Sequence, residues 1–141
     1  MPIRIDFARG AFAVALVCAG SAGAHVTANP SEGEAGSYFR TALRVGHGCK
    51  DSPTVAVRVK LPEGVVSVKA QAKPGWTVEI CKRKLDKPVD AGHGRMVDEA
   101  VDEIAWRGGP LAGEQFDEFG LLLKLPDGAG RTLWFPTVQE C

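Results

Sequence analysis

The residues of this sequence best suited to metal chemistry are its three histidines, His25, His47 and His93. His25 follows a run of small residues, and each of the other two lies between glycines. Glycines let the backbone approach an ion closely, and an imidazole nitrogen binds most divalent transition metals. Each histidine also has a plainer interpretation as a solvated loop residue. We take His25 and His47 as the candidate ligands and rank His93 last, because its glycine-rich loop is expected to be mobile.

Residues 1–24 have the organisation of a signal peptide. Arg4 and Arg9 give a positively charged start, residues 10–20 are mostly apolar, and Ala22-Gly23-Ala24 has the small residues of a cleavage site. The apolar run is too short to span a bilayer stably. We therefore predict cleavage after Ala24 and export to the periplasm or the medium.

Cleavage after Ala24 would make His25 the first residue of the mature chain. The α-amine and the imidazole Nδ1 of one terminal histidine can then bind the same ion in a chelate ring, which no internal histidine can do. A tetragonal set of nitrogen donors suits Cu(II) best among the common divalent ions. His47 could supply a second imidazole if its turn, Gly46-His47-Gly48-Cys49, lies beside the N-terminus. The sequence thus predicts a Cu(II) site at His25 and His47.

Three cysteines, Cys49, Cys81 and Cys141, remain after the signal peptide and its Cys18 are removed. In an oxidising compartment they allow at most one intramolecular disulfide. We favour Cys49–Cys141, because it would join an early turn to the last strand and close a long loop, worth about 4 kcal/mol in the chain-entropy model. No Cys-x-x-Cys pair is present, so neither a zinc knuckle nor a thioredoxin-type site is predicted.

The charge balance and the motifs exclude several functions. Lys plus Arg and Asp plus Glu both count 17, so nucleic acid is not a predicted partner, and membrane contact is left open. The sequence has no nucleophile elbow, phosphate loop or His-Glu-x-x-His motif. Acidic residues at 98, 99, 102 and 103 could imitate paired catalytic carboxylates, but neighbours on a strand point to opposite faces, and we expect a solvated edge. These observations favour a binding protein over an enzyme.

The elements that must position these residues are strands. Apolar residues alternate with polar ones in Phe39-Thr41-Leu43-Val45 and in Val55-Val57-Val59-Leu61, which are the expected inward faces. Further strands are expected at 65–70, 76–83, 97–106, 120–125 and 132–138, and a long hairpin loop at 84–96. No segment predicts a helix of useful length. The fold class is therefore all-β, an antiparallel β-sandwich in one domain over residues 25–141. We expect the three tryptophans, Trp76, Trp106 and Trp134, in its core or at its rim.

Several ordered motifs span nearly all of residues 25–141. They include His25-Val26-Thr27-Ala28-Asn29-Pro30, His47-Gly48-Cys49, Lys73-Pro74-Gly75-Trp76 and Phe135-Pro136-Thr137-Val138-Gln139. Together they resemble the YcnI-like copper-binding proteins of bacteria, in the branch with a His-Gly-Cys turn. The resemblance implies a periplasmic or secreted β-sandwich, similar to cupredoxin and immunoglobulin-like folds, that binds Cu(II) through its N-terminal histidine in a single-histidine brace.

The resemblance also implies roles for particular positions. His25 corresponds to the first ligand, through its amine and its ring. His47 lies near the turn where the better understood branch has a glutamate ligand, and we infer it as the substitute. A tryptophan near the metal in that branch follows the positions of residues 139–141, so we expect that the domain is truncated at its C-terminus here or lacks that tryptophan.

Three functions are compatible with these features. The first is a copper carrier or buffer that exchanges Cu(II) with a donor or acceptor protein in the periplasm or membrane. The second is a copper oxidase or monooxygenase of the histidine-brace type, which needs a second placed histidine and an extended substrate face. The third is a metal-free interaction module outside the cytoplasm, in which His25 and His47 could both be replaced without loss of function. The resemblance favours the carrier.

Overall fold

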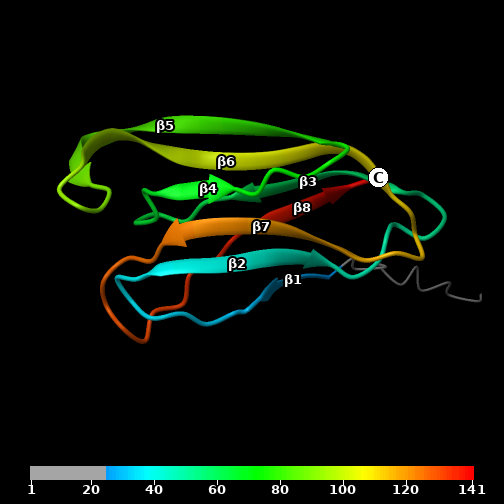
Figure 1. The fold of residues 1–141 in the computed structure, drawn as a ribbon, viewed down its shortest axis with the longest axis horizontal. Coiled ribbons are helices and arrows are strands. Elements are labelled where there is room, and N and C mark those ends of the chain that lie inside the picture. Colours follow the sequence, from blue (N-terminus) through cyan, green and yellow to red (C-terminus); the bar gives the residue numbers. More distant parts are fainter. Residues whose placement is uncertain (1–24) are drawn as a thin grey trace, which may run out of the picture.

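A computed structural model describes residues 25–141 of the protein, and the predicted signal peptide lies outside the described residues. Two four-stranded antiparallel sheets stack on each other, with strand orders β1-β2-β7-β4 and β5-β6-β3-β8 (Figure 1). The strands are β1 Val26–Asn29, β2 Tyr38–Val45, β3 Thr54–Lys60, β4 Val68–Ala70, β5 Trp76–Asp90, β6 Met96–Leu111, β7 Asp117–Lys124 and β8 Thr137–Glu140. The predicted all-β antiparallel sandwich is confirmed. Within residues 25–141 no helix is long and apolar enough to cross a membrane.

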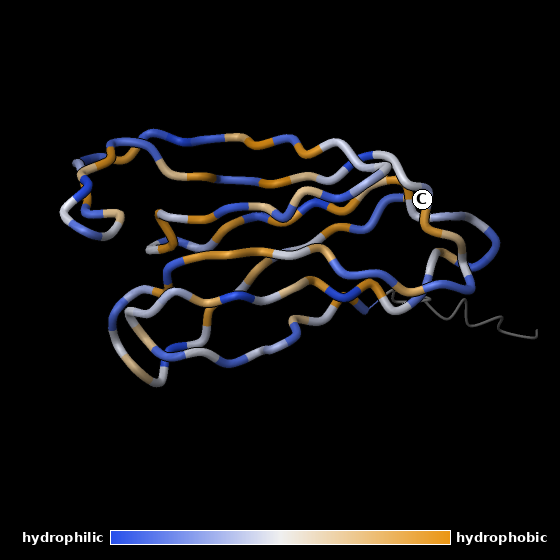
Figure 2. Tube along the Cα trace, viewed as in Figure 1, coloured by the Kyte–Doolittle hydropathy of each residue, from blue (hydrophilic) through white to orange (hydrophobic). Residues whose placement is uncertain are grey.

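Alternating side chains from both sheets fill the core. Figure 2 shows short hydrophobic segments alternating with hydrophilic ones along the strands, as a period of two requires. The largest fully buried side chains are Trp106 and Phe119, whose rings lie 5.4 Å apart between centroids. The indole of Trp106 also donates a hydrogen bond of 3.0 Å to the backbone oxygen of Gln71. The indole N–H, the one polar group of these two rings, therefore keeps a hydrogen-bond partner although it is buried.

The tryptophan prediction is correct for two of the three side chains. Trp106 is buried, and Trp76 is half-buried with its ring edge-on to Phe119, 5.0 Å between centroids. Trp134 is 77% exposed, which corrects the expected packing. It precedes β8 in an irregular segment where its neighbours Leu133 and Phe135 turn inward instead. Side chains in this segment point alternately inward and outward, so Trp134 points outward between two inward neighbours.

The predicted inward series on β3 is wrong at its first member. Val57, Val59 and Leu61 are buried, but Val55 is exposed. A register irregularity in the pairing of β3 with β6 lies between Thr54 and Ala56. Two steps along β3 match four along β6 there, so the extra residues lie on β6. At this irregular end of β3, Thr54 takes the buried position in place of Val55.

Residues 84–96, predicted as a long loop, belong mostly to strands. The hairpin of β5 and β6 extends until only residues 91–95 connect the two strands. Pro88 is tolerated because β5 is an edge strand and the pairing is irregular between Lys84 and Val89. A long two-stranded ribbon thus projects from one end of the sandwich (Figure 1).

The acidic residues at 98, 99, 102 and 103 lie on β6, and β3 pairs with β6 only as far as Glu103. Asp98 and Glu99 lie beyond that last pair and are exposed, as expected for a solvated edge. Glu103 instead forms an ion pair with Arg58 at 3.7 Å on the outer face. On the same face Arg107 donates to Glu79 at 2.9 Å, and this hydrogen bond raises the pKa of the guanidinium. Exposed pairs of this kind contribute little to stability, so we assign this face a solubilising role.

Candidate metal centre

The pairing of β1 with β2 brings His25 and His47 to one end of the sandwich. Val26 pairs with Val45, so residue 25 lies opposite Gly46, the residue before His47. Both histidines are exposed. The start of β1, the end of β2 and the C-terminus share this end of the molecule (Figure 1). The backbone at residue 25 thus lies beside the turn that carries His47, 22 positions later in the sequence, and their joint binding of a metal stays a prediction.

The His47 ring has a defined hydrogen-bonding state. Its Nδ1 lies 2.7 Å from the backbone oxygen of Gly48. A carbonyl oxygen only accepts, so Nδ1 carries the proton and donates, and Nε2 keeps its lone pair. Metal-binding histidines characteristically hold one ring nitrogen in this way while the other binds the ion. With the proton on Nδ1, the Nε2 of His47 is the ring nitrogen open to a metal ion.

Close backbone packing fixes the turn that carries His47. The Gly48 N–H donates to the Gly113 oxygen at 3.3 Å. A Cβ added to Gly48 would lie 2.8 Å from the Gly113 Cα, which leaves no room for any other residue. This is the close approach for which a glycine is required.

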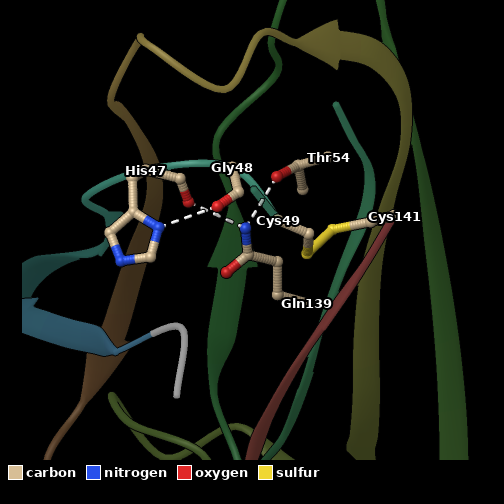
Figure 3. The surroundings of a disulfide bond; sticks show 6 residues. All are labelled: His47, Gly48, Cys49, Thr54, Gln139 and Cys141. Atoms are coloured by element: carbon tan, nitrogen blue, oxygen red, sulfur yellow. Dashed lines mark hydrogen bonds between the residues drawn. A yellow bond between two sulfur atoms is a disulfide. The ribbon is translucent and has the colours of Figure 1, made fainter. Parts of the chain in front are cut away.

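The predicted disulfide is confirmed: Cys49 and Cys141 are bonded, with Cα atoms 6.1 Å apart (Figure 3). Cys49 immediately follows the His47 turn, and Cys141 follows β8, so the bond attaches this turn to the second sheet. Cys81 is exposed and is the free thiol within residues 25–141.

Sequence reasoning missed Gln139, a residue of this same end. Gln139 pairs with the buried Val57, and side chains of paired residues share a face, so it points between the sheets. Its Nε2 donates to the His47 oxygen at 3.0 Å and to the Thr54 Oγ1 at 2.7 Å (Figure 3). Its Oε1 is buried and has no hydrogen-bond partner among residues 25–141. The only signal in the sequence was a polar residue at an inward position of a strand.

His93 does not belong to this centre. It lies in the β5–β6 hairpin with φ of +56°, and its ring stacks on Tyr38, 6.0 Å between centroids. Tyr38 begins β2, whereas His47 follows its end. Seven steps of about 3.3 Å along a strand separate those ends by roughly 23 Å. The low rank given to His93 agrees with this position.

The donors at this end fit a divalent transition metal. Imidazole nitrogen, and a terminal amine if cleavage occurs, are ligands that Cu(II) favours, and a buried carbonyl oxygen without a partner is an available oxygen donor. Within residues 25–141 no three His, Cys, Asp or Glu side chains gather closely enough to hold an ion. A groove of about 700 Å³ is lined by other residues, from β2, β7 and the segments around residues 30–35 and 125–135, Phe39, Leu121 and Phe135 among them.

Residues 25–141 match a protein family described as "Domain of unknown function (DUF1775)". The chain belongs to this family. The match begins at His25, the residue that the predicted cleavage would expose. The predicted branch with a His-Gly-Cys turn stays a prediction within the DUF1775 family.

Two individual proteins resemble this DUF1775 chain. The copper-binding protein CutI of Bacillus subtilis (strain 168) is 34% identical over 113 residues, 80% of this chain and 49% of CutI. The chain thus spans about half the length of this curated relative. The crystal structure of an uncharacterized protein from Nocardia farcinica, described as an immunoglobulin-like fold, matches with a TM-score of 0.59 at 28% identity, over 82% of this chain and 75% of that one. The likeness confirms the immunoglobulin-like sandwich.

Proposed function

We propose that this protein is exported and binds Cu(II) through His25, the first residue of its mature chain, and that it serves copper trafficking or buffering in the periplasm or outside the cell. The observation that carries the proposal is the register of β1 on β2, in which residue 25 lies opposite Gly46. The amine freed by cleavage and the ring of His25 then belong to the same end of the sandwich as the His47 imidazole.

His47 supplies the next nitrogen in this proposal. The hydrogen bond from its Nδ1 to the Gly48 oxygen leaves the Nε2 lone pair available to an ion. Two residues thus supply three nitrogen donors. A site with these donors binds Cu(II) more tightly than it binds the other common divalent ions. Affinity comes mainly from chelation by His25, because one residue contributes two donors without ordering a second loop.

The similarity to CutI supports copper as the metal, since that relative is described as a copper-binding protein. The match covers about half of CutI, so it bears on the domain in residues 25–141. Both histidines are exposed, which suits a site that receives and releases its ion by contact with another protein. The partner in this proposal is a copper donor or acceptor in the periplasm or membrane.

The decisive experiment compares two N-termini. One sample begins at His25 with a free α-amine, verified by mass spectrometry, and the other is the same chain with that amine acetylated. We expect the first to bind one Cu(II) and the second to bind it about 100-fold more weakly, because acetylation removes the amine donor and its chelate ring. Isothermal titration with a competing chelator measures both constants.

Equal affinity of the two samples would overturn the proposal, because the free amine would then contribute nothing. Export is tested separately by the mass of the protein recovered outside the cytoplasm. A cut at any bond other than the one after Ala24 would remove the chemical basis of the site.

A further inference from the structure

The Gln139 side chain has an unusual hydrogen-bonding state for the interior of a small sandwich. Its Nε2 makes two hydrogen bonds, to the His47 oxygen and to Thr54 Oγ1. Its Oε1 is buried and makes none within the described residues. Buried polar atoms almost always have a partner, and an exception calls for one that the protein chain does not itself supply, an ordered water or an ion.

The orientation of this amide is determined by its surroundings. The His47 oxygen can only accept a hydrogen bond, so the amide atom 3.0 Å from it must be the nitrogen. Exchanging the two amide atoms would bring two carbonyl oxygens together without a proton between them. The oxygen is therefore the atom left without a partner.

The free oxygen belongs to the end of the molecule that holds the candidate metal centre. Gln139 contacts the backbone of His47 directly, and in Figure 3 its Oε1 points to the side on which the His47 ring lies. The start of β1 reaches the same end, because Val26 pairs with Val45. Cys141, two residues beyond Gln139, is bonded to Cys49, which holds β8 against the His47 turn.

We propose that Oε1 of Gln139 is an oxygen ligand of the ion bound at His25 and His47, an inference that rests on the proposed function. A neutral amide oxygen is a known weak ligand of copper sites and completes a set dominated by nitrogen. Gln139 then has two tasks: its nitrogen holds the backbone of His47, and its oxygen binds the metal.

Two substitutions separate these tasks. Gln139→Leu removes both the donor and the oxygen, whereas Gln139→Glu keeps an oxygen toward the metal but cannot donate to the His47 oxygen. If the oxygen is a ligand, the Leu variant binds Cu(II) roughly tenfold more weakly, and the Glu variant binds it at least as tightly as the unchanged protein. The electron paramagnetic resonance spectrum of the Cu(II) complex should change in both variants, because the donor atom changes.

If Gln139 only holds the backbone of His47, the two variants should differ in another way. The Glu variant would then bind no better than the Leu variant, with an unchanged spectrum, and this result would overturn the inference. Thr54→Val is the matched control: it removes one partner of Nε2 and keeps both the oxygen and the hydrogen bond to His47, so affinity and spectrum should stay as they are.

Circular dichroism and urea unfolding of each variant identify any loss of fold. If a variant does not fold, the electron paramagnetic resonance spectrum is recorded instead on the unchanged protein with ¹⁷O in its glutamine amides. Broadened copper lines would show that an amide oxygen binds the ion. Unaltered lines would show that it does not, and would overturn the inference. If the unchanged protein with a free His25 binds no Cu(II), the proposed function fails. If it binds Cu(II) but the Gln139 variants do not differ from it, only this inference fails.

Discussion

At the residue scale, His47 and His93 form a matched pair of exposed histidines, each in a glycine-flanked turn. His47 shares an end of the sandwich with the start of β1, whereas His93 lies in the β5–β6 hairpin beside Tyr38. We expect His47→Ala to weaken Cu(II) binding by about tenfold or more, ~1.4 kcal/mol, because one nitrogen donor is lost. His93→Ala should leave the affinity unchanged. Competition titration of the mature protein measures both, and equal losses would contradict the assignment of His47.

At the scale of elements, the turn between β2 and β3 decides where His47 lies, and its geometry depends on one glycine. In Gly48→Ala the new Cβ would meet the backbone of Gly113, which cannot move aside as a side chain would. We expect a loss of about 1–3 kcal/mol in the free energy of unfolding, the usual cost of overpacking, together with weaker Cu(II) binding.

Gly46→Ala is the control for this prediction, since an added Cβ at Gly46 has no atom within 4 Å. Urea unfolding followed by circular dichroism gives both free energies. A Gly48 variant as stable as the Gly46 variant would show that the close approach to Gly113 is not required.

At the scale of the whole molecule, the disulfide joins the two sheets. Cys49 lies beyond β2 of the first sheet and Cys141 beyond β8 of the second, 92 residues apart. Closing a loop of this length stabilises a protein by about 4–5 kcal/mol in the chain-entropy model. The double variant Cys49→Ala, Cys141→Ala should therefore lose up to that amount in urea unfolding, and its Cu(II) affinity should fall because only the Gln139 hydrogen bond then holds β8 to the His47 turn.

Cys81→Ala controls for the loss of a cysteine. Its thiol is exposed and unbonded within residues 25–141, so its removal should change the free energy of unfolding by less than about 0.5 kcal/mol. If the double variant were as stable as the Cys81 variant, the bond would not contribute to the fold.

The sequence by itself determined the class of fold and predicted the kind of metal chemistry that a terminal histidine can perform. In a strand, successive side chains point to opposite faces, so a strand such as β2 can be predicted from a few consecutive residues. The number of such strands and the turns between them indicate a sandwich. The preferred bond between Cys49 and Cys141 followed from loop closure, and the chelating capacity of a terminal His25 followed from its covalent structure. These properties depend on residues close together in the chain, or on the number of cysteines and the length of the loop between them.

The tertiary structure alone decided what depends on pairing between distant strands. The register of β1 on β2 brings residue 25 beside the His47 turn, and the pairing of β8 turns Gln139 inward. The irregular pairing of β3 with β6 between Thr54 and Ala56 accompanies the outward position of Val55. A shift of one residue in any of these registers would exchange the inner and outer faces. Register is set by the packing of the whole core, which no short segment of the sequence contains.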